Sequence, residues 1–384
     1  MENQIRFAIL GGDQVYLDEA ASKMGKDEKT RAAAILEAYR AHWSSSSYRK
    51  ILCSIPSYLM WDDHDIIDGW GSDRAAFANE TSTTPTEKWL DWFDTAKQFF
   101  WNMQAIRNPN IFNVGVEGPF DTCFRVGNCG FVMADLRSKR NYRLQQIWLD
   151  EQFERVKQWV SKQKDMDTLF FVSTVVFAHG DPKTDESVVS FWPVVLWVVD
   201  QARKAGKFLK LVNKWDKNVG DLRDDLDDAW FSQPNKRMAE KVLDYFFDLQ
   251  NSQQGEGVNV VILSGDIHTS GYSNIYSDAP EHSNCAVIPH IVSSPVSYTP
   301  FPWIGEAFYR SKTKTVRLSE DSPYKAQISH HFANRCATVI SLRRPEGAEK
   351  QLKVKYYLEG FEEPTTVIFD LNRMSHREGL KWEI

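Results

Sequence analysis

The chain has 384 residues, 42% of them hydrophobic and 26% charged, which is enough to bury a sizeable core in one large domain or two smaller ones. Its formal net charge of −6 argues against a dedicated nucleic-acid-binding or anionic-membrane-binding protein. Composition therefore favours a globular protein with a large core.

Hydrophobic periodicity predicts strands and helices alternating over the first two thirds of the chain. Short apolar runs predict buried strands at 5–10, 58–60, 169–177 and 258–264, and residues 122–135 have the pattern of a hairpin. Apolar residues at helical spacing predict helices over 27–45, 86–104, 143–163 and 235–251. This alternation indicates an α/β fold.

After Asp266 the pattern changes to short strands, at 285–292, 336–343, 351–358 and 364–370. We expect residues 271–384 to complete a second sheet. Residues 181–233 are irregular and charged after Val199, so we expect an insertion or lid there. No linker or repeat divides the chain, and the prediction is a single domain over 1–384.

Five cysteines, at 53, 123, 129, 285 and 336, lack the spacing of a zinc or redox site. Cys123 and Cys129 could pair across the predicted hairpin, but two reduced strand cysteines are the preferred interpretation. The N-terminus has no apolar core of signal-peptide length, and the longest apolar run, 188–199, is too short to span a bilayer. We therefore expect a cytoplasmic protein with no membrane partner.

Acidic and aromatic ligand-type residues follow three of the predicted strands: Asp13 and Tyr16, then Asp63, then Asp266 and His268. The carboxyl ends of parallel strands meet at one edge of a sheet, where α/β proteins bind ligands. Many oxygen donors with a few nitrogens suit Ca, Mn or Fe, with Zn also possible. The alternatives are an acidic surface turn at 62–65, a helix cap at Asp266 with a core histidine at His268, and a Tyr16 packed under a helix.

These motifs form an ordered set that resembles the PhoD-type branch of the calcineurin-like metallophosphatases. The set is Gly-Asp-Gln-x-Tyr at 12–16, Trp-Asp-Asp-His-Asp at 61–65, Asp-x-Arg at 135–137 and Ser-Gly-Asp-x-His at 264–268. The resemblance implies a two-sheet αββα sandwich, a small-molecule phosphate ester as substrate, and two or more metal ions, Fe with Ca, Mn or Zn. It leaves the oligomeric state open.

The resemblance also assigns roles to individual residues. Asp13, Tyr16, Asp63, Asp266 and His268 become metal ligands, with Asp13 as a bridge between two ions and Tyr16 favouring ferric iron. His64 becomes the group that protonates the leaving oxygen, with Asp65 or Asp68 holding its other ring nitrogen. Arg137 becomes a phosphate-binding guanidinium, although it could instead pair with Asp135.

The sequence leaves the roles of His179, Asp228 and the pair His330-His331 open. His179 could replace a metal histidine or be structural, Asp228 could face the site or belong to a solvated acidic run, and His330-His331 is interpreted as structural or as an outer partner.

The family pattern also begins with an earlier strand that carries another ligand, and no such motif precedes Asp13. The chain is therefore expected to be either a truncated form or one with an under-coordinated site, and the open edge left in the first sheet would be a stability liability. The predicted activity is metal-dependent hydrolysis of phosphomonoesters, phosphodiesters or both. The alternative is a non-catalytic phospho-ligand-binding or scaffold protein, and a nuclease is disfavoured by the net charge.

Overall fold

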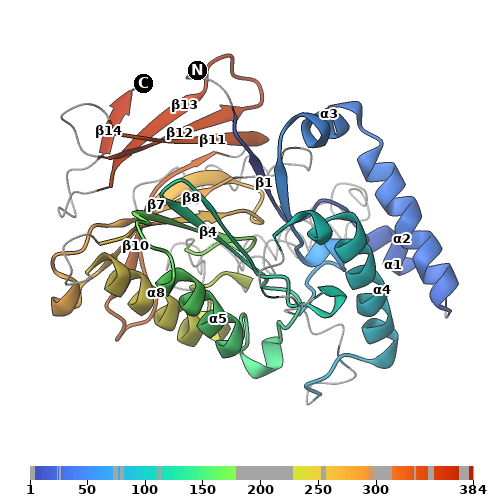
Figure 1. Ribbon diagram of the computed structural model, residues 1–384. Helices are drawn as coiled ribbons and strands as arrows, with labels where there is room; N and C mark the ends of the chain where they lie inside the picture. Colours follow the sequence, from blue (N-terminus) through green and yellow to red (C-terminus); the bar gives the residue numbers. More distant parts are fainter. Residues whose placement is uncertain are drawn as a thin grey trace, which may run out of the picture.

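The protein is described by a computed structural model that has a mixed α/β fold (Figure 1). The structure describes residues 5–23, 25, 27–71, 77, 82–109, 112, 115–178, 228–251, 257–293, 296, 314–332, 334–344, 350–371 and 380–383. The expected apolar run 188–199, His179 and nearly all of the expected insertion 181–233 therefore lie outside the described residues. Within the described part, no helix is long and apolar enough to cross a membrane.

The N-terminal part forms a parallel pair of short strands with helices beside it (Figure 1). β1 (Ala8–Gly11) pairs with β2 (Ser57–Met60), and Ile9 lies opposite Tyr58. Between them lie α1 (Asp18–Ser22), α2 (Glu28–Trp43) and α3 (Ser46–Ser54). α2 begins where predicted because the Asp27 side chain accepts a hydrogen bond from the backbone N–H of Thr30.

α4 (Glu87–Met103) packs against α2 and confirms the helix predicted over 86–104. The cluster between these helices is aromatic and aliphatic, and it contains Ile35, Trp92 and Phe100. Trp61 stacks on Phe100 with ring centroids 4.7 Å apart, and the Trp92 indole N–H donates to the carbonyl of Ile66 at 2.6 Å. This cluster therefore supports the acidic turn that follows β2.

A large mixed sheet of eight strands forms the centre of the molecule, in the order β3-β4-β5-β6-β8-β7-β10-β9. Its strands are β3 (Thr122–Val126), β4 (Cys129–Ala134), β5 (Thr168–Ser173), β6 (Asn259–Ser264), β7 (Ser270–Ser277), β8 (Ile288–Val292), β9 (Lys314–Arg317) and β10 (Tyr324–Phe332). β4, β5, β6 and β8 run parallel, so their carboxyl ends share one edge. α5 (Asp150–Ser161) and α8 (Lys236–Gln250) cover one face (Figure 1).

A smaller antiparallel sheet packs on the other face of the large one. It consists of β11 (Cys336–Arg343), β12 (Gln351–Leu358), β13 (Thr365–Asp370) and β14 (Leu380–Glu383). The buried side of β12 packs with β4, β5 and β6 in one apolar cluster, to which β1 and β2 also contribute. The Tyr356 hydroxyl donates to the carbonyl of Gly271 at 2.6 Å. A helical layer over this sheet, the remaining part of the expected αββα sandwich, stays a prediction.

The positions of some helices and strands differ from those predicted from the sequence. Residues 285–292 were expected in the second sheet, but β8 pairs with β6 and β7 in the large sheet, and β7, β9 and β10 join it too. The helix expected over 143–163 begins only at Asp150, because Gln145 is in the left-handed conformation with φ 51°. The strand expected over 169–177 ends at Ser173. The smaller sheet thus takes less of the C-terminal region than we expected.

The cysteines are free, as predicted. Cys123 lies opposite Val132 and Cys129 lies opposite Val126, so the two cysteines do not face each other across the hairpin.

Candidate metal centre

Carboxylates from three strand ends meet at one place in the structure. Asp13 follows β1, Asp62 and Asp63 follow β2, and Asp266 follows β6. One ligand oxygen from each of these four residues lies within 4.8 Å of the others. A second group joins Asp13 and Asp63 to a ring nitrogen of His64. The structure therefore brings together three of the five predicted ligands and adds Asp62, which the motif contained but the sequence did not single out.

The backbone around these carboxylates is strained. Asp13, Asp266 and His268 have φ values of 56°, 74° and 54°, a region that residues other than glycine seldom adopt. Such strain persists where surrounding contacts enforce it, often at functional sites. Asp266 and His268 are two residues apart and would share a face in an extended strand, but β6 ends at Ser264 and the chain then turns.

Asp65 holds the two N-terminal loops together and does not contact His64 in the expected way. Its carboxylate accepts hydrogen bonds from the backbone N–H groups of Gln14, Val15 and Asp62 at 3.1–3.3 Å, and from the side chain of Gln104 at 3.1 Å. Burial raises the pKa of Asp65 to about 7 despite these donors. Asp65 thus fixes the loops that carry Asp13 and Asp63.

His64 is positioned by Asp18, a partner that the sequence did not predict. Its Nδ1 lies 2.8 Å from Asp18 Oδ2, whereas its Nε2 lies 4.0 Å from Asp68 Oδ1. Burial on its own would lower the pKa of His64, but the neighbouring carboxylates of Asp63, Asp13 and Asp18 outweigh it and raise this pKa well above the usual value. Asp18 is the first residue of α1 and follows Asp13 by five residues, so its closeness to the Asp13 motif was the signal available in the sequence.

Tyr16 and His268 both lie next to this group. The Tyr16 ring centroid is 4.3 Å from that of His64, with an interplanar angle of 30°. Burial and the charge of His64 lower the pKa of His268 to about 4, although Asp63 acts in the opposite direction. A neutral imidazole is the form that binds a metal, so His268 has the protonation state of a ligand. The ligand roles of Tyr16 and His268 stay predictions.

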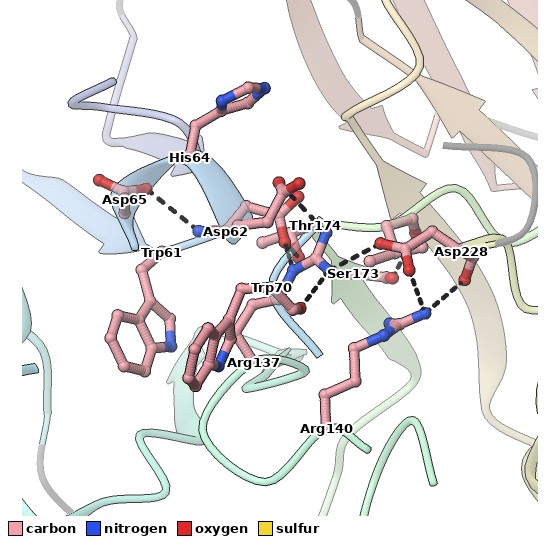
Figure 2. A network of polar contacts seen from close by, with 12 residues as sticks. Trp61, Asp62, His64, Asp65, Trp70, Arg137, Arg140, Ser173, Thr174 and Asp228 are labelled. Carbon is pink, nitrogen blue, oxygen red and sulfur yellow. Dashed lines mark hydrogen bonds and ion pairs between the residues drawn. The ribbon is translucent and has the colours of Figure 1, made fainter. Parts of the chain in front are cut away.

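Arg137 lies beneath the carboxylates with its side chain fully excluded from solvent (Figure 2). Its guanidinium contacts Asp62, lies 3.3 Å from Asp63 Oδ1 and 2.7 Å from Asp228 Oδ2, and donates to the carbonyl of Trp70 at 3.1 Å. Asp135 accepts a hydrogen bond from the backbone N–H of Arg137 at 3.1 Å, whereas the ion pairs of the guanidinium are with Asp62, Asp63 and Asp228. Asp228 thus lies behind Arg137, on the side away from His64 (Figure 2).

The histidine pair His330-His331 lies on β10, which pairs with β7 in the large sheet. His331 pairs in register with Gly271, and burial lowers its pKa to about 4. His290, on β8, is buried between the hydroxyls of Ser273 and Ser264 at 2.9 and 3.0 Å. The role expected for His330-His331, structural or as an outer partner, stays a prediction.

The residues present fit a metal ion. The buried Oδ1 atom of Asp13 accepts no hydrogen bond. Burial raises the pKa of Asp13 well above its usual value; His64 opposes this effect and Asp63 and Asp62 add to it. Crowded carboxylates removed from water are costly unless a cation compensates them. Carboxylates with nearby imidazoles are the donors used for Ca, Mn, Fe or Zn.

Comparisons with known proteins agree with the resemblance seen in the sequence. Residues 1–169 match the family model described as PhoD-like phosphatase. The uncharacterized protein YGR266W of Saccharomyces cerevisiae is 23% identical, over 63% of this chain and 37% of the yeast protein. A solved structure described as "Structure of PhoD" is similar with a TM-score of 0.55 and 12% identity, over 92% of this chain. The chain spans 59% of that protein and so is shorter than either relative.

Proposed function

We propose that this chain, whose residues 1–169 match the model of the PhoD-like phosphatase family, is a metal-dependent hydrolase of phosphoric esters. The observation that carries the proposal is the convergence of the carboxylates of Asp13, Asp62, Asp63 and Asp266 beside His64. The proposal includes the two-sheet sandwich of the calcineurin-like enzymes, which is supported by the apolar cluster between the large and the small sheet.

The proposed ligands are Asp13, Tyr16, Asp63, Asp266 and His268, with Fe together with Ca, Mn or Zn as the ions. Bound metal ions supply charge neutralisation for the phosphoryl oxygens and a hydroxide at neutral pH. Asp13 and Asp63 both belong to the two groups of converging ligand atoms, which supports a shared ligand here, and the resemblance assigns that role to Asp13. The backbone turns at Asp13 and Asp266 aim both carboxylates at one point without requiring an extended strand.

His64 is proposed to donate a proton to the leaving-group oxygen. Nδ1 lies 2.8 Å from Asp18 Oδ2, and proton donation is assigned to Nε2, which lies 4.0 Å from Asp68 Oδ1. Burial lowers the pKa of His64, but its carboxylate neighbours raise that pKa above its usual value, which favours the protonated ring that a proton donor needs. Asp18 in turn accepts from the backbone N–H of Asp68 at 2.8 Å, and this contact fixes its carboxylate.

The test is to strip the protein of metal, reload it with Fe, Mn, Ca or Zn, and measure both metal content and hydrolysis of a chromogenic phosphomonoester and phosphodiester. His64→Ala is expected to lower turnover by about 10²–10⁴-fold while metal content stays the same. His330→Ala, on the exposed side of β10, is the matched control and should keep turnover. Asp13→Asn should empty the site, because a neutral amide is a poor ligand for two cations.

Two outcomes would contradict the proposal. Absence of bound metal after every reloading, together with absence of turnover, would overturn the hydrolase assignment. Binding of a phosphorylated ligand without hydrolysis, unaffected by His64→Ala, would instead indicate a non-catalytic phospho-ligand-binding or scaffold protein.

A further inference from the structure

Arg137 is fixed in the interior at the end of β4. The Asp135 carboxylate accepts from the backbone N–H of Arg137 at 3.1 Å and from the indole N–H of Trp61 at 2.8 Å. Asp135 also accepts from the backbone N–H of Phe120 at 2.6 Å. The start of the Arg137 side chain is thus held by contacts to both sides of the site, before the guanidinium makes any contact of its own.

The guanidinium of Arg137 connects two groups of carboxylates (Figure 2). Nε donates to Asp62 and Nη2 lies 3.3 Å from Asp63 Oδ1, whereas Nη1 faces away and lies 2.7 Å from Asp228 Oδ2. The side chains of all four residues are nearly excluded from water, at 0% for Arg137, 2% for Asp62, 7% for Asp63 and 3% for Asp228. This position leaves Arg137 no solvent-exposed edge that a phosphate could approach.

Asp62 is held from a second side as well. Its Oδ1 accepts from the hydroxyl of Thr174 at 2.9 Å in addition to the Arg137 contact. Asp63 Oδ2 accepts from the backbone N–H of Gly69 at 2.7 Å. Each carboxylate is therefore oriented by its own set of donors, and Arg137 is the cation common to both.

We infer that Arg137 is an internal counter-cation that stabilises Asp62 and Asp63 in the absence of metal, and that Asp228 holds it there. This assigns Arg137 a positioning role in place of the phosphate-binding role that the sequence indicated. The inference rests on the proposed function only in treating Asp62 and Asp63 as part of the metal centre. Its physical basis is that a buried carboxylate without a compensating cation is strongly unfavourable.

Arg140 provides an internal comparison. It is as buried as Arg137, with 3% of its side chain exposed, and it also contacts Asp228, at 2.5 Å to Oδ1 and 2.9 Å to the carbonyl. Among the ion pairs of the described residues, those of Arg140 do not include Asp62 or Asp63, whereas those of Arg137 include both. A change at Arg140 therefore disturbs the same buried ion cluster without removing the cation from the two carboxylates.

The first experiment needs no metal. Urea unfolding of the full chain in a chelator is measured for Arg137→Gln, Asp62→Asn and the double variant. Arg137→Gln should lower the urea midpoint, because it leaves Asp62 and Asp63 uncompensated. Adding Asp62→Asn should recover at least half of that fall. If Arg137→Gln alone does not fold, the double variant should still fold; a double variant that is no better than Arg137→Gln overturns the inference.

The second experiment adds Mn²⁺ to the same proteins. The added cation should raise the urea midpoint of Arg137→Gln more than that of the wild type, because the ion replaces the lost charge. Arg140→Gln should respond to Mn²⁺ like the wild type. If Mn²⁺ raises the urea midpoint of the wild type, equal rises for Arg137→Gln and Arg140→Gln would contradict the assigned role.

The two experiments separate this inference from the proposed function. Recovery by Asp62→Asn in a protein that binds no metal would leave the inference standing and the hydrolase proposal overturned. The opposite result is an active metal-loaded enzyme in which Arg137→Gln keeps the wild-type urea midpoint but raises the KM for the phosphate ester. That result would leave the hydrolase proposal standing and overturn this inference. Arg137 would then be a substrate-binding residue.

Discussion

Gly12 is the position where the smallest change should disturb the acidic site the most. Its φ of 101° lies in a region that residues with a side chain rarely adopt. A Cβ added there would lie 2.6 Å from the Asp62 Cβ and 3.3 Å from the Thr174 Cγ2. Both neighbours are themselves part of the site, so the Gly12→Ala clash would be relieved only by moving Asp62.

The loss of stability expected for Gly12→Ala is the sum of a backbone cost and a steric cost. An unfavourable backbone conformation costs about 1–3 kcal/mol, and overpacking a close contact costs about 1–3 kcal/mol more. We therefore expect Gly12→Ala to lower the free energy of unfolding by about 2–6 kcal/mol. It should also weaken Mn²⁺ binding, because the Asp62 carboxylate is displaced.

The neighbouring Gly11 is the matched control. A Cβ at Gly11 would meet no atom within 4 Å, and its φ is outside the left-handed region. Gly11→Ala should change stability by less than about 1 kcal/mol. The assay is urea unfolding of both variants with parallel Mn²⁺ titration. Equal losses of stability in the two variants, or a Gly12→Ala protein with wild-type stability and Mn²⁺ affinity, would refute the reasoning.

Three further predictions follow from individual contacts. Asp18→Asn removes the charged partner of His64, so hydrolysis of esters with poor leaving groups should slow by about 10–100-fold more than that of nitrophenyl esters; an equal slowing would contradict proton donation. Asn108 pairs with both the N–H and the carbonyl of buried Leu59, at 3.0 and 2.6 Å, so Asn108→Ala should cost about 2–5 kcal/mol in urea unfolding, and a loss below about 1 kcal/mol would contradict this. Burial, together with the charge of Asp135, raises the pKa of Asp121 from 3.8 to about 7. The contribution of protonated Asp121 to the free energy of unfolding is therefore complete below pH about 4 and is lost as the pH rises through about 7, a change of about 4 kcal/mol. Asp121→Asn should flatten that part of the stability–pH profile, and an unchanged profile would disprove the assignment.

The sequence by itself determined the local elements and the motifs at the strand ends. α2, α4 and α8 lie within a few residues of their predicted bounds, because helical periodicity and capping are local properties. Asp13, Asp63 and Asp266 come together as expected, because each directly follows a parallel strand or its extension. The resemblance to PhoD-like phosphatases was visible for the same reason, since the motifs are short and contiguous.

Only the tertiary structure decided which sheet each C-terminal strand joins and what each charged residue contacts. An alternating pattern predicts a strand with one buried face, but β8 and β10 are placed by pairing with β7. Arg137 reaches Asp62 across 75 residues, and Thr174 reaches it across 112. The local sequence around an arginine is the same whether its guanidinium faces solvent or is buried. Its role depends on burial and on distant partners, which are properties of the packed fold and not of the local sequence.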